Sequence, residues 1–484
     1  MPEIISTTLW ASGAIGLLVL YFCHVNRVLT TMPEEARRLS PHRWTVDEIR
    51  EAYKRHIESP IDVAKSLPLK QQRRYIVVGG SGLVGGWIVT HLIARGENPA
   101  TIRILDLQAP RQELLNQGVA YLKTDISDEA SVENAFSQPW PQHVAHLQLT
   151  VFLTAAVLRS WERYKIYLPQ CTKVNVDGTR NVVRAAKNAG TSCLISTSSG
   201  SVGIHRPWYW IAPWTKQPKR IVQIMSESME LPRRHDEFFG NYAVSKLASE
   251  KVVQGADDPQ SNFRTGCIRP TNAVYGIGGY GSVTGTYLLS GNNPSWIPNI
   301  VQSWSNAENV SLAHLLYEQR LIELSALPSE EKTKEKDRSP TSSSSFSPSL
   351  PDIGGQVFVI CDLGPAPAFK DIYLLLSTLS ITPTTFPIVP AVPMMLLAYL
   401  VEAYAFLQYR YLSHFLSPVP SPLHQLQPAT LNISQVHVLA DDRGARKSPD
   451  QGGLGYNPPL TTMDGLCREL AEWNRRAGEK LALK

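Results

Sequence analysis

Tyr75-Ile-Val-Val-Gly79-Gly-Ser-Gly82-Leu-Val-Gly85 is the stretch that decides the fold of this chain. An apolar run ends in glycines and an amphipathic run follows, which predicts a strand, a tight turn and a helix. Gly79 would allow the turn, Gly82 would let the backbone approach a pyrophosphate, and Gly85 would let the helix pack on the strand. The helix N-terminus would then face the anion. The stretch therefore predicts a dinucleotide site.

The next predicted strand, Ile102-Arg-Ile-Leu-Asp106, ends in an acid 21 positions after Gly85. A carboxylate at that place accepts hydrogen bonds from the adenosine ribose hydroxyls and repels a 2′-phosphate. The first basic residue after it is Arg111, so the sequence favours NAD over NADP. Asp125 and Ile126, after the third predicted strand, are candidates for a carboxylate and backbone contact to adenine.

Predicted strands and helices alternate along the chain from Arg73 onward. Further strands are expected at 119–125, 149–156, 192–197, 263–269 and 356–361, with a helix at about 177–189. This order predicts an α/β protein with a doubly wound, parallel Rossmann sheet. We assign residues 73–275 to an NAD-binding Rossmann domain and 276–484 to a smaller, C-terminal substrate-binding lobe.

A Tyr and a Lys stand four positions apart in Tyr242-Ala-Val-Ser-Lys246, and Tyr242 lies 163 positions after Gly79. On a helix the two side chains share one face. The ammonium is expected to favour the phenolate, so that a phenol with an ordinary pKa of about 10 works nearer neutrality. With a dinucleotide, this pair indicates hydride transfer at a carbinol or carbonyl.

A run of hydroxyl residues, Thr197-Ser198-Ser199, ends the fifth predicted strand. In an open α/β sheet, ligands bind beyond the carboxyl ends of the strands. Ser199, with Ser198 as the alternative, is therefore the hydroxyl expected to donate to the substrate oxygen while Tyr242 exchanges the proton.

The N-terminal segment from Ile4 to Val25 is predominantly apolar and contains no Asp, Glu, Lys or Arg. A helix of this length can cross a bilayer core of ~30 Å. Its start is acidic and its basic residues follow the apolar run, unlike a cleaved signal peptide. The positive-inside bias places the downstream part on the cytosolic side. We therefore predict a membrane anchor over 1–30, a tether over 31–72, and attachment to an internal membrane, the endoplasmic reticulum.

Two later segments depart from the α/β pattern. Leu327 to Gly355 is rich in Glu, Lys, Ser and Pro and cannot build a core, which predicts a disordered surface insertion. Phe386 to Phe415 is apolar, but its prolines and Glu402 argue against a clean membrane span. A helix lying on the membrane surface is favoured over a core helix of the second lobe.

The composition narrows the classes of partner. The chain has 484 residues, 43% hydrophobic and 18% charged, which fits a globular protein with some membrane character. Its net charge of +5 is mild and no basic stripe is interleaved with aromatics, so nucleic acid is not expected as a partner. The six cysteines show no C-x-x-C and no metal-ligand spacing, which predicts free thiols in a reducing compartment and no metal site.

The stretch Val174-Asn175-Val-Asp-Gly-Thr-Arg-Asn-Val-Val-Arg-Ala-Ala resembles the N-V-x-G-T-x-N-V helix of extended short-chain dehydrogenases. Within them, the chain resembles the 3β-hydroxysteroid dehydrogenase family, including the sterol-4-carboxylate 3-dehydrogenases that decarboxylate their substrates. The resemblance runs from about residue 73 to Trp473. It includes Ile268-Arg-Pro270-Thr-Asn-Ala-Val-Tyr275-Gly276 and Leu454-Gly-Tyr456-Asn-Pro.

The resemblance implies a catalytic triad of Ser199, Tyr242 and Lys246, with Asn175 supporting a proton relay. It also implies that Lys246 binds the nicotinamide ribose and that Pro270 borders the nicotinamide. The chain departs from the family pattern in the insertion at 327–355 and in the long segment 203–240. The second departure bears on the substrate, because this segment is expected to shape the substrate pocket.

The main hypothesis is a membrane-tethered, NAD-dependent dehydrogenase that oxidises the 3β-hydroxyl of a sterol or triterpenoid. A substrate with a 4-carboxyl would yield a β-keto acid, which loses CO₂ readily. Four aromatic residues are expected to form an amphipathic lip at the membrane surface: Trp208, Tyr209, Trp210 and Trp214. Three basic residues are candidates for binding the substrate carboxylate: Lys216, Lys219 and Arg220. The plainer alternative is that these three belong to a solvated basic loop.

Three other hypotheses stay open. The first is an NAD(P)-dependent ketoreductase or dehydrogenase of a secondary-metabolite pathway that acts on a polyketide or another terpenoid. The second is an epimerase or dehydratase on a nucleotide sugar, and the third is a non-enzymatic dinucleotide-sensing protein. The anchor and the aromatic segment favour a lipophilic small-molecule substrate. The sequence leaves homodimerisation open.

Overall fold

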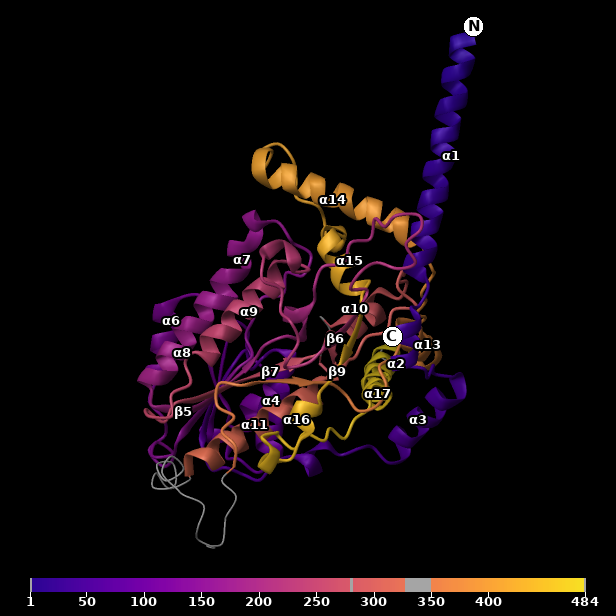
Figure 1. Cartoon of the computed structure of the whole chain (residues 1–484). Helices are drawn as coiled ribbons and strands as arrows, with labels where there is room; N and C mark the ends of the chain where they lie inside the picture. The colour runs from indigo at the N-terminus through magenta and orange to yellow at the C-terminus, as the bar shows by residue number, and fades with distance from the viewer. Residues whose placement is uncertain (1, 279–281, 327–349, 483–484) are drawn as a thin grey trace, which may run out of the picture.

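The computed structural model describes residues 2–278, 282–326 and 350–482. Its centre is a parallel sheet of seven strands in the order β10-β7-β5-β4-β1-β2-β3 (Figure 1). These strands are β1 (Arg74–Val78), β2 (Ile102–Asp106), β3 (Ala120–Lys123), β4 (Leu149–Leu153), β5 (Thr191–Thr197), β7 (Arg264–Pro270) and β10 (Val357–Ile360). The predicted doubly wound Rossmann sheet is confirmed.

β1 shows how the sequence builds a sheet with two covered faces. Tyr75 and Val77 join one hydrophobic cluster while Ile76 and Val78 join another, because alternate residues of a strand point to opposite faces. All four side chains are fully buried. The first cluster is completed by α4 (Leu83–Ala94) and α11 (Ala307–Ala326), and the second by α6 (Glu129–Ser137), α8 (Gly178–Asn188) and α9 (Asn241–Gln254).

The expected boundary at residue 275 does not separate two contiguous domains. α11 and β10 both follow it, yet α11 packs on the Rossmann sheet and β10 extends that sheet beside β7. Conversely, β6 (Val222–Met225) precedes the boundary but pairs in parallel with β11 (His437–Ala440) of the second lobe. The two lobes exchange strands, so each requires segments from both sides of the boundary.

The predicted tether contains a helix that is packed on the second lobe. α3 (Val46–Glu58) begins at a capping box, in which Glu48 N donates to Thr45 Oγ1 and Thr45 N donates to the Glu48 carboxylate. Its apolar face buries Ile49 and Ala52 against α13 (Phe369–Leu379) and α17 (Thr462–Ala482). This part of 31–72 is therefore part of the folded body, because an amphipathic helix needs a partner for its apolar face.

The predicted disordered insertion at 327–355 falls mostly outside the described residues. Its last residues are packed, since Ile353 is fully buried and its carbonyl accepts a hydrogen bond from Tyr317 Oη at 2.7 Å. Asp352 also pairs with the buried guanidinium of Arg264 at 2.5 Å. The predicted end at residue 355 is therefore wrong, because these residues lead directly into β10.

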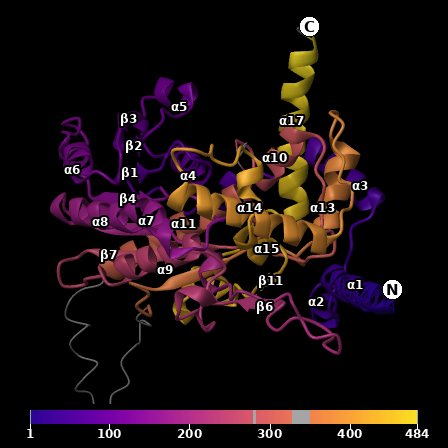
Figure 2. The same ribbon diagram turned by 90° about the horizontal axis from the view of Figure 1, so that it is seen from above.

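Two apolar helices meet at one end of the molecule. α1 (Pro2–Thr30) projects from the body, and α14 (Ala391–Tyr411) runs across the same end (Figures 1 and 2). The stretches Ser12–Leu39 and Ala391–Tyr411 are both long and apolar enough to cross a membrane. Val25 and Leu29 of α1 are buried in one cluster with Val392 and Met395 of α14, which fixes the base of the projecting helix.

The aromatic segment that was expected to form a lip is divided between surface and core. Trp208 and Trp214 are exposed, as expected. Tyr209 is buried and its hydroxyl donates to the Leu431 carbonyl at 3.1 Å. Trp210 packs between α1 and α14, with its ring centroid 6.0 Å from that of Phe22 and 6.4 Å from that of Tyr399. The prediction of a four-residue aromatic lip is therefore wrong for Tyr209 and Trp210, which pack inside the protein.

A buried carboxylate joins α17 to α10 (Val283–Ser290) in the second lobe. Thr284 Oγ1 lies 2.8 Å from both carboxylate oxygens of Glu469, and burial raises the Glu469 pKa to about 7. The Glu469 pKa is higher in the folded state than in the unfolded state. Ionisation of Glu469 therefore lowers the free energy of unfolding progressively as pH rises from about 4.5 to 7, and the whole penalty is present above pH 7.

We expect Glu469→Gln to raise the free energy of unfolding at pH 8 by up to about 3 kcal/mol and to change it little at pH 4.5. Urea unfolding at both pH values measures this difference. Glu472→Gln is the matched control, since Glu472 lies on the same helix and pairs with Arg475 and Arg476; it should give no gain. Equal stability of Glu469→Gln and the parent chain at pH 8 would contradict the expectation.

Candidate active site

The glycine-rich turn between β1 and α4 has no room for side chains at two positions. Gly79 has φ +84°, and a Cβ there would lie 2.6 Å from the backbone nitrogen of Ala155. A Cβ at Gly85 would lie 2.2 Å from the Gly79 carbonyl oxygen. Thr154 Oγ1, at the end of β4, donates to the Val78 carbonyl at 2.9 Å and so supports the turn. The tight turn and the close helix–strand packing take the form expected from the sequence.

Asp106 lies against this turn at the carboxyl end of β2. Ser81 N donates to its Oδ2 at 3.1 Å and Gln108 N donates to its Oδ1 at 3.1 Å. Gly82, the N-cap of α4, stands beside Ser81. The chain therefore places a partly buried carboxylate next to the backbone N–H groups of a helix N-terminus, an arrangement that fits a ribose and a pyrophosphate.

The two residues predicted to contact adenine follow β3. The Asp125 carboxylate accepts a hydrogen bond from Ser127 N at 2.9 Å. The Ile126 carbonyl accepts one from Asn181 Nδ2 at 3.0 Å, and the Ile126 side chain is buried under Gly178. Because these groups already have partners within the protein, a contact of this pair with adenine stays a prediction.

Ser199 and Tyr242 come together at the carboxyl end of β5, and a hydrogen bond between their side chains lowers the Tyr242 pKa. Burial acts more strongly in the opposite direction and raises that pKa to about 12. Ser199 Oγ also lies 2.8 Å from Ser201 Oγ. The expectation that the phenol is activated below its ordinary pKa is therefore wrong, because desolvation of Tyr242 outweighs the favourable contact with Ser199.

Lys246 lies one helical turn after Tyr242 and is buried. Its Nζ donates to the Thr197 carbonyl at 2.7 Å, and burial lowers its pKa to about 8. Glu250 and Cys267 act in the other direction and raise that pKa. The amino group thus stands at the end of β5, beside the Ser199 turn, with a charge that is sensitive to pH near neutrality.

Asn175 and Pro270 complete the predicted set. Asn175 lies in a π-helical turn, Lys173–Asp177, and its Nδ2 donates to Ser245 Oγ at 2.9 Å and to the Val157 carbonyl at 3.1 Å. It therefore joins the loop after β4 to the helix that carries Tyr242. Pro270 ends β7, and its carbonyl oxygen would lie 3.0 Å from a Cβ on Gly200, beside Ser199. Single π-helical turns are frequent at functional sites.

Sequence reasoning missed a buried ion pair that supports this site. Arg269 donates to both carboxylate oxygens of Glu250, at 2.8 and 2.5 Å, and Ser198 Oγ donates to Glu250 Oε2 at 2.5 Å. Ser198 is thereby committed to the pair, which favours Ser199, whose side chain meets that of Tyr242, as the hydroxyl that would donate to a substrate. The available signals were the position of Glu250, one turn after Lys246, and that of Arg269 within an apolar strand.

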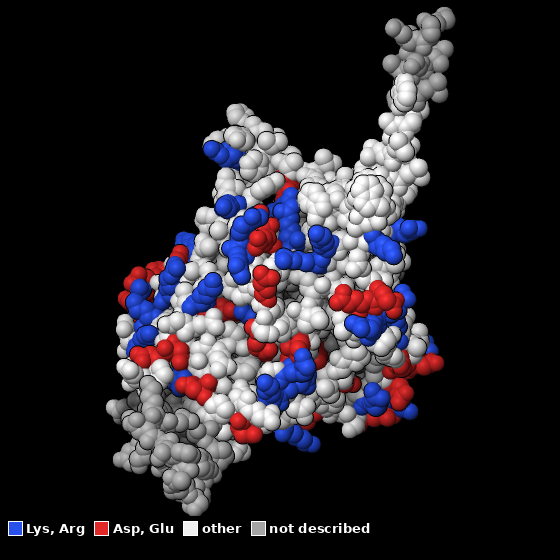
Figure 3. All heavy atoms as spheres, in the orientation of Figure 1, with Lys and Arg blue, Asp and Glu red and all other residues white. Residues whose placement is uncertain are grey.

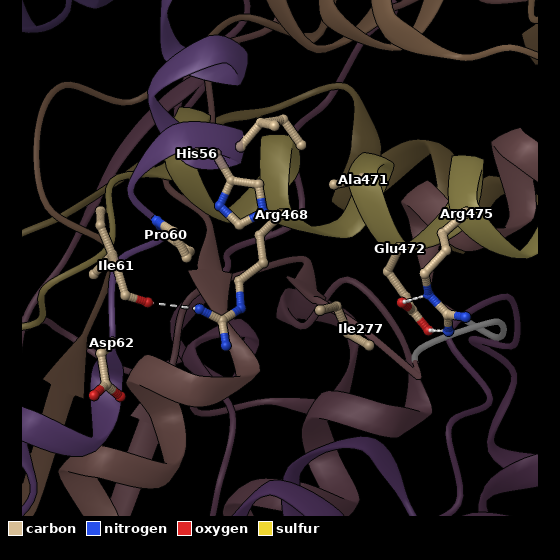
Figure 4. A pocket seen from close by; sticks show the side chains of 10 residues that line it. His56, Pro60, Ile61, Asp62, Ile277, Arg468, Ala471, Glu472 and Arg475 are labelled. Carbon is tan, nitrogen blue, oxygen red and sulfur yellow. Dashed lines mark hydrogen bonds and ion pairs between the residues drawn. The ribbon is translucent and has the colours of Figure 1, made fainter.

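A surface pocket of ≈ 570 Å³ lies at a different place, where α3 meets α17 (Figure 4). None of the predicted site residues lines it. Its two arginines are paired within the protein, Arg468 with Glu308 at 2.9 Å and Arg475 with Glu472 at 2.9 Å. We therefore locate the candidate active site by the residues around β5 and the glycine turn.

A family model, the 3-beta hydroxysteroid dehydrogenase/isomerase family, matches residues 76–380. The chain belongs to this family. The matched range contains the glycine turn, Ser199, Tyr242 and Lys246. The resemblance inferred from the sequence is thus confirmed, and the 3β-hydroxysteroid dehydrogenase family is one of extended short-chain dehydrogenases that act on CH–OH groups.

Individual relatives carry related names. Sterol-4-alpha-carboxylate 3-dehydrogenase, decarboxylating, of Homo sapiens is 29% identical over 43% of this chain and 46% of its own length. Sterol-4-alpha-carboxylate 3-dehydrogenase ERG26, decarboxylating, of Saccharomyces cerevisiae is 26% identical over 51% of this chain and 65% of its own length. The 3beta-hydroxysteroid-dehydrogenase/decarboxylase isoform 2 of Arabidopsis thaliana is 26% identical over 82% of this chain and 62% of its own length. The chain thus spans about half to two thirds of the length of these relatives.

Solved structures agree with the 3β-hydroxysteroid dehydrogenase family in fold. UDP-glucose 4-epimerase of Thermotoga maritima, with UDP-glucose, superposes with a TM-score of 0.51 at 16% identity, over 84% of this chain and 99% of that one. MoeE5 in complex with UDP-glucose and NAD superposes with a TM-score of 0.51 at 17% identity, over 84% of this chain and 99% of MoeE5. At this level of identity the likeness shows the shared Rossmann architecture.

Proposed function

We propose that this chain is a membrane-associated, NAD-dependent oxidoreductase that oxidises the 3β-hydroxyl of a sterol or triterpenoid, with loss of a C4 carboxylate where one is present. The observation that carries the proposal is the meeting of Ser199, Tyr242 and Lys246 at the end of β5, beside the glycine turn that begins α4. Family membership and the names of the relatives support the substrate class.

The residues around the glycine turn would hold the cofactor. Gly79, Gly82 and Gly85 would leave the backbone open to the pyrophosphate, Asp106 would accept from the adenosine ribose, and Lys246 would donate to the nicotinamide ribose. Pro270 would border the nicotinamide, and Asp125 and Ile126 would contact adenine. When bound, NAD supplies the acceptor for the hydride. The carboxylate of Asp106 supports NAD over NADP.

The protein's own groups would move the proton. Ser199 would donate to the carbinol oxygen and hold it beside Tyr242, whose phenolate accepts the hydroxyl proton as the carbonyl forms. Lys246 would stabilise that phenolate when protonated, and Asn175 would support onward proton transfer. A ketone next to a carboxylate-bearing carbon accepts the electrons of the breaking C–C bond, which releases CO₂.

The surface around α14 supports membrane contact. α14 presents exposed apolar side chains, among them Leu397, Leu400 and Leu407. Its Glu402 is buried in an ion pair to Arg163, which ties the helix to the body and favours a helix on the membrane surface over a spanning one. With α1 as the anchor, the enzyme would face the cytosol at an internal membrane, the endoplasmic reticulum, and receive an apolar substrate from it.

We expect deletion of residues 2–20 to move at least part of the enzyme from the membrane pellet to the supernatant. The cut removes the projecting part of α1 but keeps Val25 and Leu29, which pack on α14. Fractionation at high salt measures the distribution. If the deletion stays fully bound, Leu400→Ser with Leu407→Ser should release it; retention of the combined variant would contradict both contacts.

The proposed activity is tested by NADH formation with purified enzyme and a panel of substrates. We expect NADH with 3β-hydroxysterols, and none with UDP-glucose or with UDP-galactose. Because epimerisation is redox-neutral and releases no NADH, the UDP-sugar reactions are also analysed for interconversion of UDP-glucose and UDP-galactose. Such interconversion without sterol oxidation would favour the epimerase class, and activity with NADPH and a polyketide ketone alone would favour a ketoreductase.

A further inference from the structure

A surface loop at the base of α1 is anchored at both of its ends. Ile211 and Ile221 are buried in the hydrophobic cluster that also holds Val25 of α1 and Val392 of α14. The residues between these two anchors, 212–220, form the loop. Because both ends are fixed in one cluster, the loop stays at the junction of α1 and α14.

The ring contacts of Trp210, just before this loop, give its depth along α1. The Trp210 ring centroid lies 6.0 Å from that of Phe22 and 6.5 Å from that of Tyr21. The exposed apolar stretch of α1 reaches Leu20, and Arg27 is the first Lys or Arg of the helix. Phe22 and Arg27 are about 7 Å apart along the helix axis. With α1 crossing the bilayer, Trp210 therefore lies where the hydrocarbon gives way to the headgroups.

α14 lies at the same depth and presents an apolar stripe. The ring centroid of its Tyr399 is 6.4 Å from that of Trp210. Exposed apolar side chains recur along α14 three or four positions apart, so they lie on one face of the helix. These side chains are those of Leu397, Leu400, Tyr404, Leu407 and Tyr411. Because α14 runs across the direction of α1 (Figure 1), it can lie in the membrane surface that α1 crosses.

The loop combines an exposed tryptophan with free cations. Trp214 is 84% exposed, and Lys216 and Lys219 are exposed as well. Neither lysine makes a hydrogen bond or an ion pair within the described residues, and the segment 206–226 contains no Asp or Glu. In the space-filling view, Lys and Arg side chains appear where the uncharged α1 meets the body (Figure 3). Tryptophan and lysine together are typical of a membrane interface, where the ammonium groups attract anionic headgroups.

We propose that the loop 212–220 is a docking surface for anionic phospholipid headgroups, with Trp214 at the bilayer interface and Lys216 and Lys219 on the lipid charges. The inference rests on the proposed function, because it names the lipid class that the membrane-associated face recognises. Lys216, Lys219 and Arg220 were candidates for a substrate carboxylate, but all three are exposed, which favours a partner outside the active site. A bilayer is favoured over an acidic protein because the loop continues the apolar surface of α1 and α14 at one depth.

The test is amide hydrogen exchange of the full-length enzyme in two kinds of nanodisc, one of phosphatidylcholine and one of phosphatidylcholine mixed with phosphatidylserine. We expect the amides of 212–220 to exchange about 10-fold or more slowly in the anionic discs, because each lysine near such a surface strengthens the contact about fivefold. The difference should shrink as the salt concentration rises from about 0.1 to about 1 M, since the screening length falls to about 3 Å.

Lys216→Gln with Lys219→Gln should make the loop exchange at the same rate in both discs. The matched control is Lys187→Gln with Lys251→Gln, which removes two exposed lysines of the Rossmann domain and should keep the full difference.

Equal exchange of the loop in the two discs with the parent enzyme, or an unchanged difference in the Lys216 and Lys219 variant, would overturn the lipid surface. Co-elution of the enzyme with both discs would in that case leave the proposed membrane association standing, whereas elution apart from both would overturn it as well. NADH formation is measured on the same samples, so that a failure of the lipid surface is distinguished from a failure of the proposed oxidation.

Discussion

Tyr242→Phe is expected to lower turnover with a 3β-hydroxysterol by about 100-fold or more, the scale of a lost general acid or base. The substitution removes the hydroxyl that meets Ser199 and leaves the aromatic ring in its hydrophobic cluster. Affinity for NAD should therefore stay within about twofold of the parent value, because the glycine turn and Asp106 are untouched. Steady-state kinetics and cofactor titration measure the two effects.

The matched control is Tyr373→Phe, which removes a buried hydroxyl bonded to Ser295 at 2.8 Å, in the second lobe. It should leave turnover nearly unchanged. Undiminished turnover in Tyr242→Phe would remove this residue from the chemistry.

The pH profile of the parent enzyme tests the same assignment independently. The oxidation needs the Tyr242 phenolate, whose pKa is about 12, and a protonated Lys246, whose pKa is about 8. Below pH 8 the phenolate fraction increases with pH, so kcat/KM should rise about tenfold per pH unit. Above pH 8 the loss of the ammonium offsets that gain and the profile should level off. A flat profile from pH 6 to 8 would contradict these roles.

Gly85→Ala is expected to lower kcat/KM for the cofactor by about 100-fold or more, the scale seen when binding geometry is displaced by about 1 Å. The new Cβ would stand 2.2 Å from the Gly79 carbonyl oxygen and 2.7 Å from Thr154 Oγ1, so the helix must move away from the turn. Cofactor titration by fluorescence and steady-state kinetics measure the loss.

Gly86→Ala is a close control, because it makes the same change one residue later in α4. Its Cβ would meet the Gly80 carbonyl oxygen at an ordinary 3.6 Å. Alanine also favours a helix over glycine by roughly 1 kcal/mol at both positions, so helix propensity cannot explain a difference. Equal kinetics of the two variants would contradict the role of Gly85 in the turn.

The central sheet could be predicted from the sequence because its strands are buried on both faces. β1 and β4 are mostly apolar, with Arg74 only at the start of β1 and Thr150 as the one polar residue of β4, and the glycines that follow β1 mark the turn. The site was predictable where a motif carried the chemistry, as in the spacing of Tyr242 and Lys246. The direction of the Tyr242 pKa was not, because it depends on burial that only the folded chain reveals.

The second lobe was less predictable because its contacts are non-local. β6 and β11 are four-residue strands separated by more than two hundred positions, and neither carries a strong apolar pattern. The pairing of Glu402 with Arg163 likewise joins residues far apart in the chain. In the sequence Glu402 only weakened the case for a membrane span, and its partner gave no signal.

The most direct test of the proposed function is the mass of the product formed from a 3β-hydroxy-4-carboxysterol and NAD by the purified enzyme. We expect a ketone that has lost two hydrogens and CO₂, with one NADH formed for each product molecule. The absence of any NAD-dependent product from this substrate and from neutral 3β-hydroxysterols would contradict it.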